Sequence, residues 1–335
     1  MILSLGRATT LARQAMVGVG HSDEEAAVIA DHLIDCELRG LGFGGLSRAV
    51  SVIERIQATP TTRQELRIER ESAVSAAIDG GDQVGYLVAQ RATDLAIAKA
   101  RSGGLAVVGA RNTWYTGMFS YYLEQVTEAG FIGMAAGSGA HIVAPHGGTE
   151  ARFGTNPLAF GFPTTGTPVI WDIGTSSVML GEVLVRHREG RPLDAGTAFG
   201  PDGQPTQDPV AALFGGAFTV WGGHKGSGLA LVVQLLGMAC GAAAAPQGVA
   251  GCGFMLVVVD PGLLTDADDF RQKAAQYADH VRATRPADED RPVRVPFDRS
   301  AAERDRRRRD STVEISEDTY AALINVASSA AGGQS

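Results

Sequence analysis

The sequence predicts a mixed α/β protein that begins with a helical lobe. Apolar residues recur at helical spacing over the first 60 residues, and between residues 73 and 136 short apolar segments alternate with amphipathic ones. With 335 residues, 44% of them hydrophobic, the chain is too long for one core of ordinary size. We therefore expect a helical N-terminal lobe over residues 1–70, joined by C-terminal helices over 261–335, and an α/β region over 71–260.

The helical lobe carries start and stop signals. Ser22 followed by three acidic residues is typical of a helix N-cap with a negatively charged first turn. Apolar residues then line one face as far as Ile34, and four glycines within residues 40–45 end the helix. A second helix is expected over residues 46–57, followed by a polar linker over 59–71.

The α/β region is expected to alternate strands and helices. A helix over residues 86–101 is closed by Ser102-Gly103-Gly104, because glycine suits a left-handed C-cap. The other elements expected before residue 150 are strands over 73–79, 105–110 and 132–136 and a helix over 118–129. Those expected after it are short strands within 153–172, a strand near 183–188, a polar loop over 194–209, a helix over 225–244, a strand over 253–259 and a charged helix over about 265–285.

One apolar segment, residues 228–259, is long enough to cross a membrane. Gln234, Pro246 and Gln247 interrupt it, and the Gly-Cys-Gly at 251–253 is typical of a turn into a strand. We therefore expect a buried helix followed by a strand, and no association with a membrane.

Charge, cysteine content and the N-terminus bear on the partners and location of the protein. The net charge of −8 does not favour nucleic acid, and the charged run at 303–310 has acidic residues at both ends, which favours a solvated or interface helix. The cysteines, Cys36, Cys240 and Cys252, share no CxxC spacing, so reduced thiols and no metal site are expected. The N-terminus lacks the pattern of a signal peptide, and we expect a cytoplasmic protein.

Two glycine-flanked segments mark the candidate site. They are Gly154-Thr155-Asn156-Pro157 and, about seventy residues later, Gly222-Gly223-His224-Lys225-Gly226. Glycine allows a ligand to approach the main chain, and the ammonium group of Lys225 suits a phosphate or a carboxylate. The pair predicts an anionic cofactor held by loops.

The usual nucleotide-binding fingerprints are absent from the sequence. Gly137-Ser138-Gly139 and the glycines at 40–45 do not lead from a strand into a helix with the third glycine and later acid of a GxGxxG motif. No Walker motif occurs either. A nucleotide would therefore bind outside the doubly wound scheme.

A series of further motifs runs through the chain in a fixed order. They are Leu38-Arg39-Gly40 with Gly45 and Arg48, Asp79-Gly80, Arg111-Asn112-Thr113, Ala144-Pro145-His146-Gly147-Gly148, Asp172-Ile173-Gly174-Thr175-Ser176, Asp202-Gly203-Gln204-Pro205-Thr206 and Asp208-Pro209, with the two glycine-flanked segments among them. Together they resemble the malate/L-lactate dehydrogenase family of the second, non-Rossmann type, over about residues 20 to 300. No single motif is decisive, but so many in one order are hard to obtain by chance.

The resemblance implies a fold, a cofactor and a reaction. It implies a homodimer with a distinctive mixed sheet that binds NADH or NADPH in extended form over residues 71–260, and an active site closed by the partner subunit. Members of the family move a hydride between the nicotinamide and a 2-oxo acid or a cyclic C=N carbon. By resemblance, Arg48 pairs with the substrate carboxylate through its guanidinium, and Lys225 approaches the reacting end. The cofactor contacts implied are Thr116, Gly117, Met118, Thr155, Asp172, Gly174, Thr175, Ser176, His224 and Arg299.

The chain departs from the family where the proton donor is expected. The family's Asp-Ser-His-Gly is replaced by Gly42-Phe43-Gly44-Gly45, so Gly44 stands in place of the catalytic histidine. In the family's Asn-Ser-x-His-Phe-Gly, Tyr115 takes the place of the second histidine. Reduction of a ketone needs a proton donor, and histidine suits that task because it titrates near neutral pH. Chemistry of the lactate or malate type is therefore not what the residues favour.

Three explanations stay open for these departures. The substrate is an iminium ion that already carries its proton; or Tyr115 donates the proton, assisted by a cation such as Lys225; or the redox activity is lost. Phe43 and Trp114 add apolar surface and favour a bulkier substrate. We expect an NAD(P)H-dependent reductase of a C=N or an unusual C=O group, with an ordinary 2-hydroxy-acid dehydrogenase and a non-redox binding protein as alternatives.

Several candidate residues also have plain structural explanations. Asp172 is expected to cap a turn rather than to abstract a proton, and His224 fits a contact at a helix N-terminus. His141 and His146 lack a third ligand at a suitable spacing, so no metal is expected. The basic stretch at 186–188 would suit the 2′-phosphate of NADP but cannot be placed from sequence, which leaves NAD and NADP open.

Overall fold

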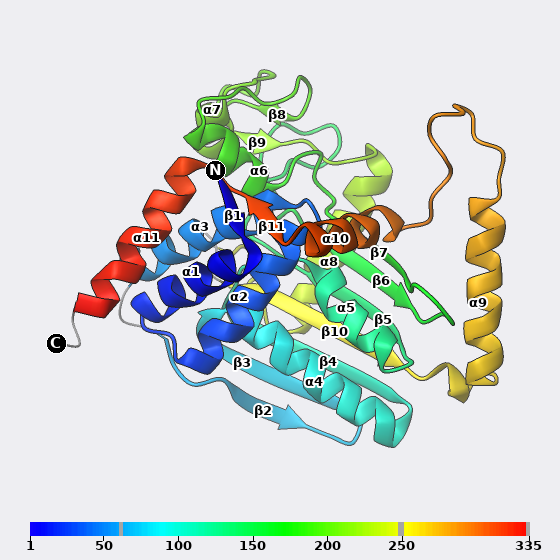
Figure 1. Cartoon of the computed structure of the whole chain (residues 1–335). Helices are drawn as coiled ribbons and strands as arrows, with labels where there is room; N and C mark the ends of the chain where they lie inside the picture. The colour runs from blue at the N-terminus through cyan, green and yellow to red at the C-terminus, as the bar shows by residue number, and fades with distance from the viewer. Residues whose placement is uncertain (60–62, 247–250, 333–335) are drawn as a thin grey trace. The chain divides into compact units, whose positions relative to one another are not determined.

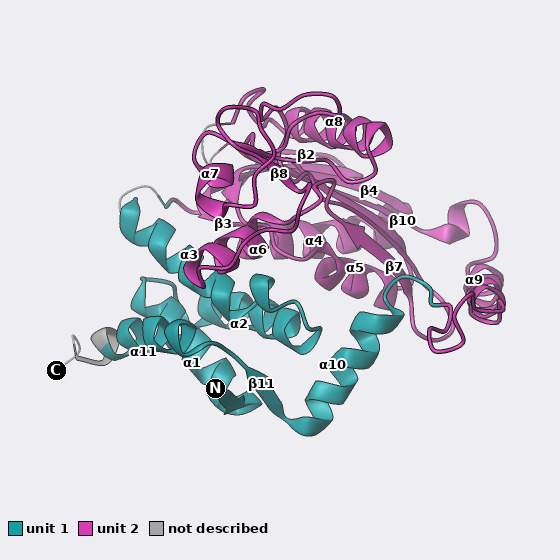
Figure 2. Ribbon diagram, turned by 90° about the horizontal axis from the view of Figure 1, so that it is seen from above, with its two compact units in different colours: residues 1–63, 294–335 teal, residues 64–293 magenta. Residues whose placement is uncertain are grey.

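The computed structural model describes residues 1–59, 63–246 and 251–332, and the chain divides into two compact units. Unit 1 consists of Met1–Arg63 together with Arg294–Ser335, and unit 2 is Gln64–Val293 (Figure 2). Unit 1 thus joins the two ends of the chain. The C-terminal segment of unit 1 starts later than residue 261, the boundary expected from sequence, because the charged helix before residue 285 belongs to unit 2.

Unit 1 is mainly helical (Figure 1). Its elements are β1 Ile2–Ser4, α1 Leu5–Gly18, α2 Asp23–Leu38, the 3-10 helix η1 Gly42–Gly44, α3 Leu46–Ala58, α10 Asp298–Asp310, β11 Thr312–Glu314 and α11 Glu317–Gly332. β1 pairs with β11 in antiparallel fashion, and α1 packs between α2 and α11. The two ends of the chain are therefore tied to each other within one core.

The start of α2 confirms the capping signal in the sequence. The Ser22 hydroxyl accepts from the Glu25 N–H, and the Glu25 carboxylate accepts from the Ser22 N–H. This reciprocal pair is a capping box, which satisfies two backbone donors that the helix itself leaves free. The apolar face predicted for α2 is buried, from Ala26 to Leu38. The second helix, predicted over residues 46–57, is α3.

Unit 2 is built on a mixed sheet. Within the described residues the sheet has seven strands in the order β2-β3-β4-β10-β5-β6-β7. Its strands are β2 Arg67–Glu71, β3 Ser75–Val84, β4 Leu105–Trp114, β5 Ile132–Gly137, β6 Leu158–Phe162, β7 Val169–Ile173 and β10 Cys252–Val259. Only the β3–β4 pair is parallel, and the other neighbours are antiparallel. A mixed α/β fold that is not doubly wound is thus confirmed.

Helices cover both faces of this sheet. α4 Gly85–Gly103 and α5 Phe119–Glu128 lie on one face, and α8 His224–Ala239 lies on the other (Figure 2). Glycines in the strands let the helices approach: a Cβ on Gly133 would meet Leu123 of α5, and one on Gly109 would meet Cys240, the C-cap residue of α8. The predicted left-handed C-cap of α4 is Gly104, at φ 73°.

The remaining elements of unit 2 form a smaller core and an outlying helix. They are α6 Leu180–Arg188, β8 Ala198–Phe199, α7 Pro209–Leu213, β9 Ala217–Phe218, the 3-10 helix η2 Pro261–Leu263 and α9 Ala267–Arg282. Val143, Val183, Leu193 and Phe218 are central to the smaller core. None of the helices in the described part of the chain is long and apolar enough to cross a membrane, and the apolar segment after residue 228 folds as α8 and then β10.

Three local predictions were wrong. The segment at 183–188 is the second half of α6 rather than a strand, because Arg186 reaches back one turn to Glu182 and three basic residues lie at the helix C-terminus, where the dipole favours them. The polar linker contains β2, which pairs with β3 although its side chains are polar, as an edge strand can be. β4 continues beyond residue 110 to Trp114, since β10 and β3 pair with it there.

Candidate functional site

Main-chain hydrogen bonds join three of the segments singled out in the sequence. The N–H and the hydroxyl of Thr175 both donate to the carbonyl of Thr155, at 2.8 and 3.0 Å. The N–H of Trp221 donates to the carbonyl of Thr175 at 2.8 Å. The segments around residues 154–157, 172–176 and 222–226 therefore lie side by side in unit 2, and Thr175 is their common member.

Asn156 anchors this arrangement to α8. Its side chain is fully buried, its Nδ2 donates to the carbonyl of Ala230 and to Oε1 of Gln234, and its Oδ1 accepts from the N–H of Gly139. A buried amide that lost such partners would cost roughly 1–3 kcal/mol per group left unsatisfied. Asn156 is not among the predicted contacts, although its motif is, because a sequence does not show which side chain of a motif points inward.

The glycines of the two flanked segments mainly allow close packing of main chain. A Cβ on Gly154 would lie 2.6 Å from Cα of Gly139, and a Cβ on Gly226 would overlap the carbonyl oxygen of Trp221. Gly222 and Gly223 have φ of 64° and 61°, which allows the chain to turn into α8. The interpretation of these glycines as points of ligand approach therefore does not hold for Gly154 and Gly226, which pack against protein.

His224 and Lys225 open α8 and are both exposed. The N-cap residue of this helix is Gly223, so no side chain caps its first turn. Unpaired N–H groups at a helix N-terminus and an adjacent ammonium group together suit an anion. His146 lies beside them: its ring centroid is 6.3 Å from that of His224, and its main-chain N–H donates to the Ser227 hydroxyl at 3.1 Å. This donor set fits a phosphate or a carboxylate.

Thr116, Gly117 and Met118 form the turn into α5. Gly117 has φ of 77°, the Thr116 carbonyl accepts from the Tyr122 hydroxyl at 2.9 Å, and Met118 is the N-cap. Asp172, at the end of β7, accepts from the N–H of Ser120 at 2.7 Å. The structure thus brings Asp172 to the N-terminus of α5, so this carboxylate caps a helix 52 residues away in sequence rather than a turn next to it.

Tyr115 follows directly after β4 and has a left-handed backbone conformation. Its φ is 54°, and its ring meets the edge of the Trp114 ring with centroids 5.4 Å apart. Trp114 itself is only 2% exposed, and its Nε1 donates to the carbonyl of Asp82. The expectation that Trp114 adds apolar surface for a substrate is therefore wrong, because its indole is part of the core. Tyr115 is half-buried.

The residues preceding Tyr115 form a polar cluster around Asp79. Its carboxylate accepts from the Gly81 N–H, from Nδ2 of Asn112 and from Nη2 of Arg111. Burial alone would raise the pKa of Asp79, but these hydrogen bonds and the charge of Arg111 outweigh it and lower the pKa. Arg111 and Asn112, which carried part of the resemblance, thus hold the end of β4.

The remaining predicted site residues belong to unit 1. Arg48 lies in the first turn of α3, where its N–H donates to the carbonyl of Gly45 at 2.9 Å. Arg299 lies in the first turn of α10 and is exposed. Phe297, just before α10, has φ of 82° and stacks under the Arg39 guanidinium, 4.7 Å from its ring centroid. The phenyl ring is thus part of the core of unit 1.

Glu37 is a residue that the sequence did not single out. It ends α2, is 3% exposed and accepts from the N–H of Leu46 at 2.6 Å. Burial raises the pKa of Glu37 to about 7, against the smaller opposite effects of that hydrogen bond and of Arg307. The nine-residue spacing matches no capping pattern, so sequence offered no signal.

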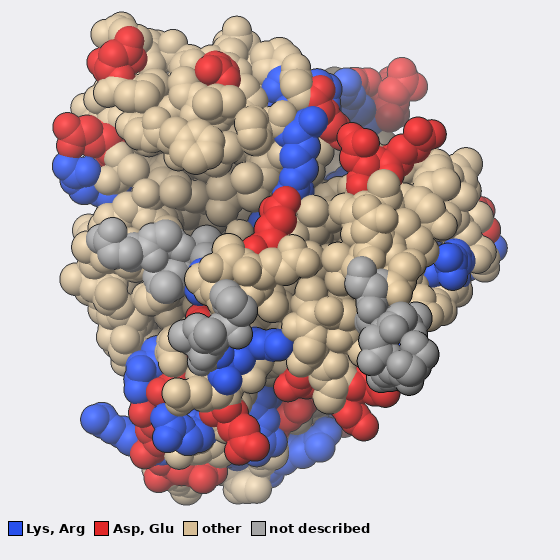
Figure 3. All heavy atoms as spheres, turned by 90° about the vertical axis from the view of Figure 1, so that its left-hand side faces the viewer, with Lys and Arg blue, Asp and Glu red and all other residues tan. Residues whose placement is uncertain are grey.

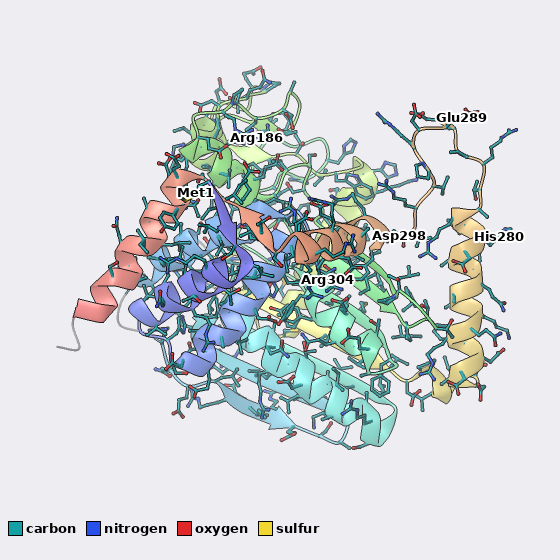
Figure 4. The ribbon with its side chains drawn as sticks, in the orientation of Figure 1. Met1, Arg186, His280, Glu289, Asp298 and Arg304 are labelled. Atoms are coloured by element: carbon teal, nitrogen blue, oxygen red, sulfur yellow. The ribbon has the colours of Figure 1, made fainter. Side chains whose placement is uncertain are left out.

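The basic stretch at 186–188 is not a free phosphate site. Arg186, labelled in Figure 4, donates to both carboxylate oxygens of Asp194 and to Glu182, and these hydrogen bonds raise the pKa of its guanidinium. On the face in Figure 3, Lys and Arg side chains are interspersed with Asp and Glu. Among the described residues, no group of three His, Cys, Asp or Glu side chains is arranged to hold a metal.

Comparison with known proteins gives consistent matches. A family model described as malate/L-lactate dehydrogenase matches residues 3–324. The chain is 29% identical to L-sulfolactate dehydrogenase of Methanothermobacter thermautotrophicus, over 94% of this chain and 93% of that protein. It is 33% identical to Delta(1)-pyrroline-2-carboxylate reductase of Ancylobacter novellus, over 70% of this chain and 69% of that protein. A crystal structure of a dehydrogenase from Sinorhizobium meliloti matches with a TM-score of 0.89 at 31% identity, over 98% of both chains.

These matches agree with the fold. The family model covers nearly the whole chain, and the matching crystal structure shares the same mixed-sheet architecture. The similar proteins are dehydrogenases and reductases. The chain therefore belongs to the malate/L-lactate dehydrogenase family and is an NAD(P)-dependent oxidoreductase.

Proposed function

We propose that this oxidoreductase reduces a C=N bond, in a cyclic imine or iminium ion, or an unusual C=O bond. Two observations together carry the proposal. The loops at 154–157, 172–176 and 222–226 are joined by hydrogen bonds, and Gly44 and Tyr115 stand where the family resemblance led us to expect histidine. An iminium ion already carries its proton, so its reduction does not need a histidine. The similarity to a Delta(1)-pyrroline-2-carboxylate reductase also supports a C=N substrate.

The cofactor of this reaction would be NADH or NADPH. The exposed Lys225 and the uncapped first turn of α8 fit an anionic group, with Thr155, Thr175 and His224 close by. The Asp172 carboxylate suits a ribose hydroxyl better than a phosphate, because like charges repel. We assign Thr116, Gly117, Met118, Gly174, Ser176 and Arg299 to the remaining contacts, on family resemblance.

The residues of the chain would have separate tasks in catalysis. The reduced nicotinamide supplies a hydride when bound. Arg48 holds the substrate carboxylate, because a guanidinium matches it with two parallel hydrogen bonds. Lys225 adds positive charge near the reacting end, and Tyr115 contacts the reacting group. For an oxo substrate the Tyr115 hydroxyl donates the proton that the developing alkoxide needs.

An ordinary 2-hydroxy-acid dehydrogenase is the second candidate. His146 and His224 favour it, since two exposed imidazoles lie at the start of α8 with Lys225, and imidazole is a common acid–base group in enzymes. The similarity to an L-sulfolactate dehydrogenase fits this candidate as well.

We also propose that the chain works as a homodimer in the cytoplasm. α8 carries a row of exposed apolar side chains at helical spacing, Leu231, Val232 and Leu235, each about half exposed. Apolar surface of this kind is usually covered by a partner. The three cysteines are all free, which fits a reducing compartment.

The test begins with fluorescence titration of NADH and NADPH, followed by turnover with a panel of acceptors. We expect saturable binding of at least one cofactor and oxidation of it by Delta(1)-pyrroline-2-carboxylate, with turnover at least tenfold faster than with 2-oxo acids. Failure to bind either cofactor would contradict the redox assignment. Faster turnover of a 2-oxo acid would favour the second candidate.

A further inference from the structure

The side chain of Asn156 links parts of unit 2 that are distant in sequence. Its Oδ1 accepts from the N–H of Gly139, shortly after β5, at 3.1 Å. Its Nδ2 donates to the carbonyl of Ala230 at 2.8 Å and to Oε1 of Gln234 at 3.0 Å, one turn apart on α8. Asn156 is 0% exposed and Gln234 is 3% exposed. Water therefore does not compete for these hydrogen bonds, which hold α8 against the loop at a fixed distance.

The main chain around Asn156 is shaped to bring its amide inward. Asn156 has φ of 38°, in a left-handed region that asparagine tolerates better than most residues with a side chain. A Cβ on Gly154 would lie 2.5 Å from Oδ1 of Asn156, so a side chain at that position would displace the amide. The glycine and the asparagine of this motif therefore serve one contact: Gly154 leaves the space that the amide of Asn156 occupies.

Asn156 joins α8 to a loop of the proposed cofactor site. Thr155, the residue before it, receives two hydrogen bonds from Thr175, so the loops at 154–157 and 172–176 are held together. Lys225 precedes Ala230 on α8 by roughly 8 Å along the helix axis, at about 1.5 Å per residue. A helix is stiff over so short a length. The hydrogen bond at Ala230 therefore fixes where the first turn of α8, with its N–H groups and Lys225, lies relative to Thr155.

Other contacts of α8 constrain its position less closely. At its first turn the main-chain N–H of His146 donates to the Ser227 hydroxyl, but this hydrogen bond is exposed to water. Further along the helix, Val233 packs with Leu158 of β6. Hydrophobic contact is non-directional and allows small shifts of a helix, whereas a hydrogen bond fixes both distance and direction. Of these contacts, that of Asn156 is the one that is both buried and directional.

Gln234, the second acceptor on α8, is not explained by stability alone. Its Oε1 accepts from Nδ2 of Asn156, but its buried Nε2 has no hydrogen-bond partner among the described residues. A buried donor without an acceptor lowers the stability of the fold. A methionine of similar length would avoid this loss of stability. What the glutamine adds at this position is therefore the acceptor for Asn156.

We propose that Asn156, together with Gln234, is a positioning residue for the cofactor. By holding α8, the pair sets the distance between the first turn of this helix, where Lys225 offers its charge, and the loop that contains Thr155. This inference rests on the proposed function, in which Lys225 and Thr155 contact NADH or NADPH. Asn156 is itself fully buried, so it acts through these neighbours rather than on the cofactor.

Asn156→Gly tests this role because glycine adopts φ of 38° freely but lacks the amide. We expect the dissociation constant of NAD(P)H to rise about tenfold in the fluorescence titration, because a displaced first turn of α8 binds the cofactor less well. We expect kcat with Delta(1)-pyrroline-2-carboxylate to fall about tenfold, since small misplacements of reacting groups have effects of this size. The KM of the imine should stay within about twofold, because Arg48, which we propose binds its carboxylate, belongs to unit 1.

Gln234→Met separates positioning from stability. The variant loses the acceptor for Asn156 but also loses the unsatisfied donor, so its melting temperature should stay within about 2 °C of the wild type. The dissociation constant of NAD(P)H should nevertheless rise about threefold. This variant keeps the inference testable if Asn156→Gly does not fold.

Val108→Ala is the matched control for lost stability. Val108 in β4 is fully buried, and it faces the side of the sheet away from α8, because the next residue, Gly109, faces Cys240 at the end of that helix. The variant should lower the melting temperature by about 3 °C or more. The dissociation constant of NAD(P)H should stay within about twofold of the wild type.

Hydrogen exchange in the protein without cofactor gives a readout that does not depend on activity. In Asn156→Gly the amides of residues 226–232 in α8 should exchange about tenfold faster than in the wild type, because the buried anchor of the helix is lost. The amides of β4 should exchange at the wild-type rate. Unchanged exchange in α8 would show that Asn156 does not hold the helix.

The outcomes separate the inference from the function it rests on. If the wild type binds neither NADH nor NADPH, the proposed function fails, and the positioning role fails with it. If the wild type binds a cofactor and Asn156→Gly or Gln234→Met binds it equally tightly, the proposed function stands and the positioning role is wrong. A loss of affinity in Val108→Ala as large as that in Asn156→Gly would also overturn the inference, because the effect would then be one of stability.

Discussion

Three residues of unit 2 near the candidate site have a left-handed backbone conformation. Asn112, Tyr115 and Asn156 have φ of 53°, 54° and 38°. Asparagine tolerates this region, but a tyrosine there costs of the order of 1–3 kcal/mol unless its surroundings hold it. The edge contact with buried Trp114 is one interaction that holds Tyr115. Backbone of this kind fixes the direction of the side chain, which is what a group that contacts a substrate needs.

Tyr115→Phe should separate substrates by their need for a proton. With a cyclic iminium ion we expect kcat within about threefold of the wild type, since the phenyl ring keeps the packing and the substrate already carries its proton. With an oxo acceptor we expect kcat to fall about a hundredfold, because the hydroxyl is the donor in that case. Steady-state kinetics on both substrates give the comparison.

An equal fall in kcat with both substrates would contradict this assignment. An equal loss would mean that the hydroxyl positions the substrate or cofactor rather than donating a proton. Trp114→Phe is the matched structural control. It should lower the melting temperature, because it removes buried volume and the hydrogen bond to Asp82, and it should not discriminate between substrates.

At the scale of elements, the helices of unit 2 begin in different ways. α5 receives the Asp172 carboxylate at the N–H of Ser120, whereas α8 begins at Gly223 without a side-chain cap. A carboxylate at a helix N-terminus stabilises the helix by interacting with its dipole. α8 lacks that stabilisation and instead presents free N–H groups beside Lys225. Of these two helices, α8 is the one that is suited to an anion.

Replacing Asp172 should reveal whether it has one task or two. Asp172→Ala removes the acceptor of the Ser120 N–H, which should cost about 1 kcal/mol and lower the melting temperature by about 2–4 °C. Asp172→Asn retains an acceptor and should melt close to the wild type. If the carboxylate also binds the cofactor, both variants should weaken NAD(P)H binding in the fluorescence titration. Unchanged binding in both would leave Asp172 with capping alone.

Elements with strong local signals were predicted well, and those decided by tertiary contacts were not. α2 was recognisable because Ser22 and the acids after it form a capping box with local atoms. α6 was missed because its apolar residues fit strand and helix periods equally, and the deciding contact is between Arg186 and Glu182. β2 was missed because a polar edge strand gains its hydrogen bonds from its neighbour β3.

The candidate site shows the same division between local and distant determinants. The motifs identified the loops at 154–157 and 222–226, whose joining through Thr175 is seen only in the structure. The resemblance also indicated which positions lack histidine. Glu37 and Asn156 were not found, because burial and the direction of a side chain depend on partners distant in sequence.

At the scale of the whole molecule, the exposed apolar row on α8 predicts self-association. Leu235→Glu places a charge in the middle of surface that we propose is covered in a homodimer, and burial of an unpaired charge is costly. We expect the wild type to sediment as a dimer at micromolar concentration and L235E to sediment as a monomer. Analytical ultracentrifugation measures both.

A second apolar position supplies the control for this experiment. Leu264 is 89% exposed and lies after η2, outside the apolar row of α8, so Leu264→Glu should leave the sedimenting mass unchanged. A monomeric wild type, or a dimer that survives L235E, would show that α8 is not the interface. Loss of turnover in monomeric L235E would further indicate that the partner completes the active site.

The hydrogen bonds between the loops of unit 2 have a consequence for how such enzymes diversify. Thr155, Thr175 and Trp221 are joined mostly through main-chain atoms, which every residue type except proline provides in full. Point mutations at positions outside this network, such as 115, leave its main-chain hydrogen bonds in place. An ancestral gene is thus able to acquire new substrate chemistry in single steps, without an intermediate in which the cofactor loops are lost.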